Sequence, residues 1–182
     1  MNSQRAAVIR GASMDTFLEE EDAAFLDHPM DVAEAVLGRD DRVHIERSDD
    51  GDLSFTCKGA WCPVTGFLGW REELPAVLLT VSCDLAAPKS RMAEAARLIA
   101  MINENLWLGH FDLWTEDGSI VFRHSIPMIG RGELTAGEVQ ALLAATMDAA
   151  DRFFPAFDYL LRCGQSAEDS LKIALFETIG EA

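Results

Sequence analysis

Residues 76–85, AVLLTVSCDL, form the clearest alternating stretch of the chain, and this stretch constrains the fold most. Every second side chain is apolar, in the set Val77, Leu79, Val81, Cys83 and Leu85. The side chains between them are mixed, in the set Leu78, Thr80, Ser82 and Asp84. Successive side chains of a β-strand point to opposite faces, so the pattern predicts a strand with one buried face. Strands of this kind are typical of antiparallel sheets that are covered on one side.

The other patterns predict helices grouped with such a sheet. Further strands are expected near residues 43–45, 53–57 and 64–70, with two more within 108–130, and helices at 29–37, 88–105, from 135 onward and after 166. Gly38 is expected to close the first helix in the left-handed conformation. Thr135 and Glu138 form a capping box for the long helix, which Pro155 is expected to kink or end. Grouped strands followed by helices predict an α+β fold, an antiparallel β-sheet with helices packed on one face.

Length and charge limit the classes of protein and partner. A chain of 182 residues fits one domain, and we expect residues 1–27 to be a partly flexible leader before a domain at 28–182. A short acidic helix is expected within the leader, in the stretch TFLEEEDAAFL. The net charge of -16 is spread along the whole chain. Nucleic acid and anionic membranes bind clustered Lys and Arg, so we expect neither as a partner.

The termini and cysteines indicate the compartment. The N-terminal stretch lacks the apolar core of a signal peptide, and no segment has the length of a membrane span. We therefore expect a cytoplasmic protein. In that compartment the four cysteines should be reduced thiols.

Residues 108–130, LGHFDLWTEDGSIVFRHSIPMIG, raise the question of a reactive site. The stretch predicts a hairpin whose turn is either the two-residue Asp117-Gly118 or the four-residue segment 115–118. Either turn gives one coherent apolar face, made by Phe111, Leu113, Ile120, Phe122, His124 and Ile126. His110 and His124 then point to opposite faces, so they cannot share a metal ion or a proton relay.

The polar face of this hairpin has a structural explanation. With the two-residue turn, Asp112 lies directly opposite Arg123, which predicts a cross-strand ion pair. A pocket with His110, Asp112 and Arg123 at its mouth is the alternative, and it would suit an enzyme or a small-ligand binder.

Other motifs of catalysis or metal binding are missing from the sequence. It contains no C-x-x-C or H-E-x-x-H motif, no phosphate-binding loop, no G-x-S-x-G elbow and no dinucleotide-binding fingerprint. The acidic run 19–22 lacks the ligand spacing of a calcium loop. We therefore predict no catalytic residue, no cofactor and no metal site.

Three aromatic residues in the third predicted strand and just before it are the candidate binding residues. Trp61, Phe67 and Trp70 would lie in the core if they are buried. If one or two of them are exposed, they mark a protein-binding or dimer surface.

Several segments together resemble the YbjN domain family of bacterial proteins. They are HPMDVAEAVLG, GWREELPAVLLTVSCDL, RLIAMINENLWLGHFDLWTEDGSIVFRHSI, FFPAF and ALFETIGEA, and the similarity covers roughly residues 28–182. The resemblance implies a fold similar to type III secretion chaperones and the Tir chaperone, which are small, acidic, dimeric proteins that bind other polypeptides. The family is described as a sensory transduction regulator, and the resemblance transfers no catalytic residues.

The function expected from the sequence is therefore a non-enzymatic protein-binding module, chaperone-like or regulatory. It would act as a cytoplasmic homodimer with an unknown protein partner. The enzyme or ligand binder near His110, Asp112 and Arg123 remains the alternative.

Overall fold

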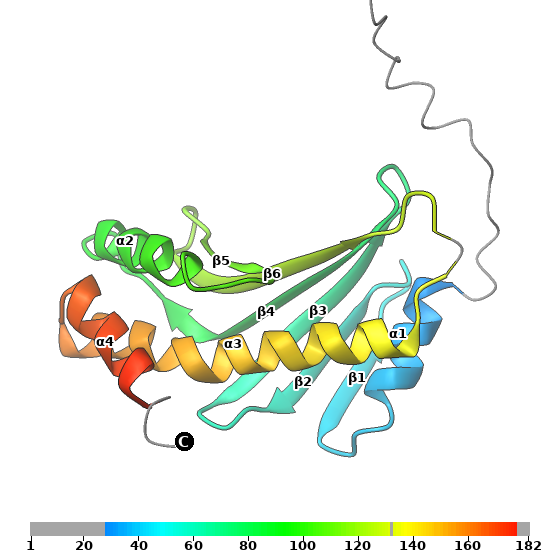
Figure 1. Ribbon diagram of the computed structural model, residues 1–182, viewed down its shortest axis with the longest axis horizontal. Helices are drawn as coiled ribbons and strands as arrows, with labels where there is room; N and C mark the ends of the chain where they lie inside the picture. Colours follow the sequence, from blue (N-terminus) through cyan, green and yellow to red (C-terminus); the bar gives the residue numbers. More distant parts are fainter. Residues whose placement is uncertain (1–27, 132, 178–182) are drawn as a thin grey trace, which may run out of the picture.

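The computed structural model describes residues 28–131 and 133–177, which form four helices and six strands (Figure 1). Their order is α1 (Pro29–Leu37), β1 (Val43–Arg47), β2 (Leu53–Lys58), β3 (Pro63–Arg71), β4 (Ala76–Ala86), α2 (Met92–Asn103), β5 (His110–Leu113), β6 (Ser119–Pro127), α3 (Ala136–Cys163) and α4 (Ala167–Glu177). The expected leader and its acidic helix lie outside the described residues.

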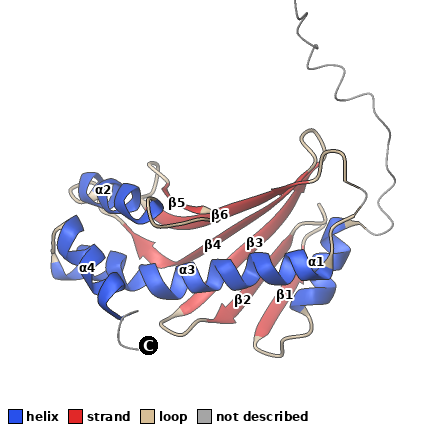
Figure 2. Cartoon of the chain, in the orientation of Figure 1, coloured by secondary structure: helices blue, strands red, loops and turns tan. Residues whose placement is uncertain are grey.

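The strands form one antiparallel sheet in the order β1-β2-β3-β4-β6-β5. The long helix α3 runs across one face of this sheet (Figure 2). The inward-facing Val77, Leu79 and Val81 of β4 are fully buried, whereas Leu78, Thr80 and Ser82 on the other face are half-buried. The α+β fold with an antiparallel sheet and helices on one face is thus confirmed.

A cluster of phenylalanines joins the sheet to α3. The ring of Phe111 on β5 lies 5.2 Å from that of Phe122 on β6, measured between centroids, in an edge-on arrangement. It also contacts Phe153, Phe154 and Phe157 of α3 at 6.0, 5.6 and 5.3 Å. Pairs of this geometry add stability beyond the area that they bury.

Helix α3 begins as predicted but does not end at Pro155. Thr135 and Glu138 make the complete capping box. The helix then continues through Pro155 to Cys163 and closes at Gly164, which adopts the left-handed conformation. The two residues on each side of Pro155 are buried, so tertiary packing outweighs the hydrogen bond that proline cannot make.

The first two helices depart from the expected boundaries in small ways. Gly38 caps α1 with φ -68° and ψ -4°, so the prediction of a left-handed residue there is wrong. A side chain at Gly38 would approach the carbonyl oxygen of Glu34 to 3.2 Å, a tight contact. Helix α2 begins at Met92 because Pro88 opens a turn in which Arg91 N donates to its carbonyl at 2.7 Å.

The hairpin of β5 and β6 uses the longer of the two expected turns. Leu113 pairs with Ile120 and Asp112 with Val121, which corresponds to the four-residue turn and excludes Asp117-Gly118 as a two-residue turn. Asp112 is therefore not directly opposite Arg123, yet the two still form a diagonal ion pair at 3.2 Å. His110 pairs with Arg123 on one face, and His124 lies on the other, as predicted.

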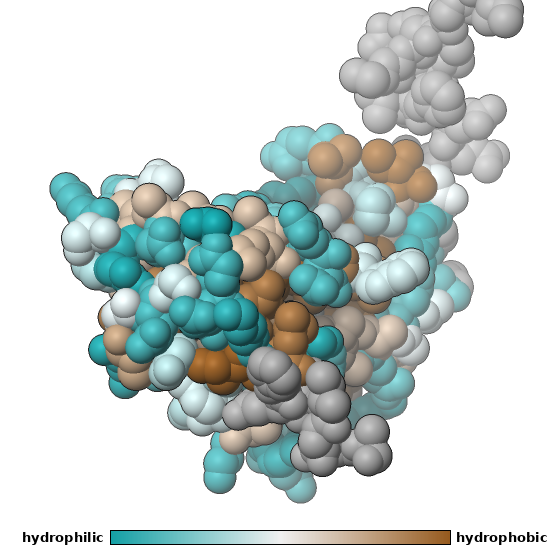
Figure 3. Space-filling model, turned by 60° about the vertical axis from the view of Figure 1, so that its left-hand side comes forward, coloured by the Kyte–Doolittle hydropathy of each residue, from teal (hydrophilic) through white to brown (hydrophobic). Residues whose placement is uncertain are grey.

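The surface on the side of α2 and α4 is mostly hydrophilic, with a smaller hydrophobic area near its centre (Figure 3). In the described part of the chain, no helix combines the length and apolar character needed to cross a membrane. Trp107, in the connection from α2 to β5, is fully exposed.

The outer edge of β5 is closed by a side chain of α2. Asn103 Nδ2 donates to the carbonyl of Phe111 at 3.1 Å, and its Oδ1 accepts from the Phe111 N–H at 2.8 Å. One amide thus replaces the neighbouring strand that β5 lacks. A covered edge of this kind resists pairing with another chain.

Replacing Asn103 by Ala should leave both backbone groups of Phe111 without a partner. We expect the free energy of unfolding, measured by urea denaturation, to fall by about 1–3 kcal/mol. Asn105→Ala is the matched control, since the exposed side chain of Asn105 donates to Met101 O within its own helix end, and it should change stability by less than about 0.5 kcal/mol. Equal effects of the two substitutions would contradict this role of Asn103.

Candidate functional site

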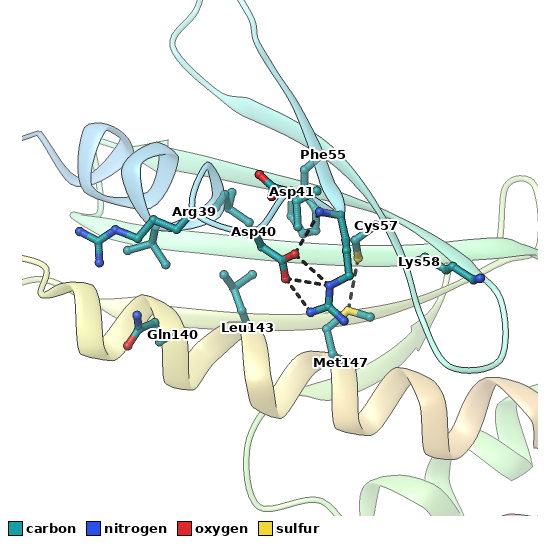
Figure 4. A pocket seen from close by; sticks show the side chains of 13 residues that line it. Arg39, Asp40, Asp41, Phe55, Cys57, Lys58, Gln140, Leu143 and Met147 are labelled. Atoms are coloured by element: carbon teal, nitrogen blue, oxygen red, sulfur yellow. Dashed lines mark hydrogen bonds and ion pairs between the residues drawn. The ribbon is translucent and has the colours of Figure 1, made fainter.

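An open groove lies between α3 and the β1–β2 corner of the sheet, beside the C-terminal end of α1 (Figure 4). We call it the α3–β1 groove; its volume is about 630 Å³. Its lining is Val36, Leu37, Arg39, Asp40, Asp41, Arg42, Val43, Phe55, Cys57, Lys58, Gln140, Leu143 and Met147.

The floor of the groove is apolar, and part of it is open to solvent. Leu143 and Met147 are one turn apart on α3, and Val43 and Cys57 are direct partners across β1 and β2. All four side chains are half-buried. Spacing of four on a helix and pairing across two strands therefore bring these residues together from both sides.

The sulfur atoms in this floor are structural rather than reactive. Cys57 Sγ lies 3.6 Å from Met147 Sδ and donates to it. Burial raises the pKa of the Cys57 thiol, so the neutral form dominates near neutral pH. A neutral thiol is a weak nucleophile, and here it extends the apolar floor.

The rim of the groove carries more positive than negative charge. Arg42 Nη2 and Nε donate to Asp40 at 2.6 and 2.9 Å. This hydrogen bonding lowers the pKa of Asp40 to about 2, so the pair persists at physiological pH. Arg39 and Lys58 are exposed and form no ion pair with any described residue. The lining thus holds three cations and two carboxylates, an excess of one positive charge on a chain of net charge -16.

A second, smaller groove continues around the end of β2. It has a volume of about 380 Å³ and shares Arg42, Cys57 and Lys58 with the first. His44 and Trp61 also line it, and Trp61 is 41% exposed. The loop that carries Trp61 is held against α3, because Asp151 Oδ1 accepts from Ala60 N at 2.8 Å.

The three candidate aromatic residues do not form one surface. Trp61 lies in the loop before β3, beside the second groove. Phe67 points to the face of the sheet that carries no helix. Trp70 points to the opposite face, packs against the core and contacts the ring of His28 at 6.0 Å. Their roles in protein binding therefore stay predictions, to be considered for each residue separately.

The alternative site at His110, Asp112 and Arg123 has a different geometry from the one expected. These side chains share the sheet face that points away from α3, because Phe111 between them packs on that helix. They are therefore not at the mouth of a pocket between sheet and helices. Across residues 28–131 and 133–177, no group of three or more His, Cys, Asp or Glu side chains is placed to hold a metal ion.

Sequence reasoning missed the α3–β1 groove and one cysteine pair. Cys62 and Cys83 lie close enough to influence each other's titration, and burial raises the pKa of both thiols. Cys62 precedes β3, and Cys83 lies where the pairing of β4 with β6 shifts register. No spacing rule predicts a contact between an irregular loop and a bulge. The groove joins segments about 100 residues apart, but the stripe of α3 that continues through Leu143 and Met147 was a usable signal.

A comparison with protein-family models adds the family. Residues 29–158 match the model YbjN, described as "Putative bacterial sensory transduction regulator". The chain belongs to the YbjN family. The match covers all of the sheet, α1, α2 and most of α3, including every residue that lines the α3–β1 groove.

The other two comparisons add little to the assignment. The comparison with curated proteins gave no match. A chain in the solved structure titled "Crystal Structure of the ExsC-ExsE Complex" is similar, with a TM-score of 0.45 and 18% sequence identity. The similarity covers 67% of this YbjN-family chain and 87% of the other chain. At this level it assigns no function.

Differences in burial predict the order in which the cysteines react. Near neutral pH, iodoacetamide should modify the exposed Cys163 first and Cys57, Cys62 and Cys83 much more slowly, because burial raises the pKa of these three thiols. Raising the pH should speed modification of the slow group. Peptide mass spectrometry over time gives the four rates, and a Cys83 that reacts as fast as Cys163 would contradict the described packing.

Proposed function

We propose that this YbjN-family protein is a non-enzymatic module, chaperone-like or regulatory, that binds another polypeptide in the α3–β1 groove. The observation that carries the proposal is the open apolar floor between two cations at opposite ends of the groove, Arg39 and Lys58, that have no ion-pair partner among the described residues (Figure 4). Apolar side chains that stay accessible within a polar rim are typical of protein-binding surfaces. Membership of a family described as regulatory supports the same direction.

The chemistry of the groove indicates the kind of segment that it binds. Half-exposed Val43, Leu143 and Met147 suit aliphatic or aromatic side chains, and the methionine adapts to different shapes. Arg39 and Lys58 suit carboxylates that flank them. We therefore expect a partner segment in which acidic and large apolar residues alternate in short groups.

The proposal includes a homodimer that forms through the helix-free face of the sheet. A depression of about 490 Å³ on this face is lined in part by Phe67, Trp114 and Val121. Phe67 and the neighbouring Leu78 are half-buried in the single chain, so a second copy could bury both. We propose that this dimer acts in the bacterial cytoplasm and that residues 28–182 form one domain.

Charge reversal on the rim should weaken partner binding without disturbing the fold. The full chain with Arg39→Glu and Lys58→Glu is compared with the parent chain in affinity capture from native cells, followed by mass spectrometry. Two reversed rim charges should lower recovery of specific partners by roughly tenfold. Lys89→Glu is the matched control, since Lys89 is also exposed and unpaired among described residues but lies in the β4–α2 connection. Partners that the double variant and the parent chain recover equally would refute the groove as binding site.

The dimer has its own test. Analytical ultracentrifugation of the parent chain should show a dimer, and Phe67→Glu should shift it to monomer by burying a charge in the contact. Thr56→Glu is the control and should leave the dimer intact. Thr56 is exposed on the same face of the sheet, nearer the β1 edge. A monomeric parent chain at micromolar concentration would contradict this part of the proposal.

A further inference from the structure

The sequence before α1 has the composition that the α3–β1 groove calls for. Residues 16–26, TFLEEEDAAFL, place four consecutive carboxylates, Glu19 to Asp22, between the apolar pairs Phe17-Leu18 and Phe25-Leu26. The groove offers an apolar floor and a rim on which Arg39 and Lys58 have no ion-pair partner among the described residues. Opposite charges and matched apolar character thus occur in one chain.

The length of chain before α1 is sufficient for this contact. The described chain starts at His28, directly before α1, and the opposite end of α1 contributes Val36 and Leu37 to the groove. A helix of nine residues is about 14 Å long. The acidic run lies six to nine residues before His28. An extended chain of that length spans about 20–30 Å. Subtracting the length of α1 leaves about 6–16 Å, so residues 19–22 can lie along the rim of the groove beyond that end of the helix.

The charges of the described surface make this groove a preferred destination. Most described Lys and Arg side chains are already engaged by carboxylates or carbonyl groups. Within residues 28–131 and 133–177, the exposed cations without such a partner are Arg39, Lys58 and Lys89. Two of these three lie on the rim of the groove, whereas Lys89 lies in the connection from β4 to α2. In Figure 1, α2 and α1 lie at opposite ends of the molecule.

We propose that residues 16–26 occupy the α3–β1 groove of their own chain when no partner is bound. Glu19 to Asp22 pair with Arg39 and Lys58, and Phe17-Leu18, the apolar pair farther from His28, covers Leu143 and Met147. A partner must displace this segment, so its apparent affinity is reduced by the fraction of occupied grooves. The inference rests on the proposed function of the groove, because it makes the segment a competitor for that surface.

Zero-length cross-linking tests the occupancy in the full chain. A carbodiimide joins a carboxylate to an amine only where the two are in contact, so Lys58 should link to Glu19, Glu20, Glu21 or Asp22. Lys89 serves as the internal control and should link to these residues at least about fivefold less. Arg39→Glu should lower the Lys58 links several-fold, and so should about 0.5 M salt, because both weaken the attraction between the segment and the rim. Tandem mass spectrometry locates each link.

A mixture of unlabelled and ¹⁵N-labelled chains separates the possible occupants. Links within one isotope form support the proposal, whereas Lys58 links found mainly between light and heavy chains would overturn it in favour of a second copy. An absence of links between Lys58 and the acidic run, or a yield equal to that of Lys89, would also overturn it.

The result is independent of the capture experiment. Missing links together with reduced capture by Arg39→Glu and Lys58→Glu would reject occupancy by residues 16–26 and leave the proposed function in place. Links that form while those two substitutions leave capture unchanged would reject partner binding at the groove and keep the intramolecular contact.

Discussion

The packing of Phe111 against α3 is the interaction on which the rest of the molecule depends. Phe111 lies near one edge of the sheet and contacts Phe153, Phe154 and Phe157 in the C-terminal half of the helix. This contact fixes α3 over β4 and β6, with which it packs directly. At the other edge of the sheet, α1 lies between α3 and the sheet and packs on β1, β3 and α3. The β1–β2 corner is consequently covered only in part, and the α3–β1 groove lies there.

The two edge strands of the sheet, β5 and β1, therefore have different surroundings. At β5 the side chain of Asn103 completes the backbone hydrogen bonding of the last strand. At β1, Arg47 bridges to Asp31 and Glu34 of α1, while Arg39 and Lys58 remain without ion pairs among the described residues. On a chain with net charge -16, exposed cations without local partners indicate a place where an acidic segment can bind. The covered edge and the open corner together support the proposal that a partner segment binds beside α3.

The sequence predicted the sheet well because burial on one face imposes a period of two. The alternation in 76–85, the parity of the hairpin and the capping box at Thr135 are local signals, and all three appear in the structure. Of the two outcomes predicted at Pro155, a helix end is wrong, because the buried neighbours that hold the helix together are visible only after folding. The local sequence allowed a two-residue and a four-residue hairpin turn and could not distinguish them; the structure has the longer one. The α3–β1 groove needs Val43, Cys57 and Met147 to meet, and no motif records a contact between such distant segments.

The most direct test of the account is an unbiased selection of binding peptides. A random peptide library is displayed and selected on the full chain, and the enriched sequences are then measured against the chain with Arg39→Glu and Lys58→Glu. The account predicts enriched peptides that combine carboxylates with large apolar residues and that lose most of their affinity for the substituted chain. Peptides without acidic residues, or with equal affinity for both chains, would contradict the claim that the α3–β1 groove is the binding surface.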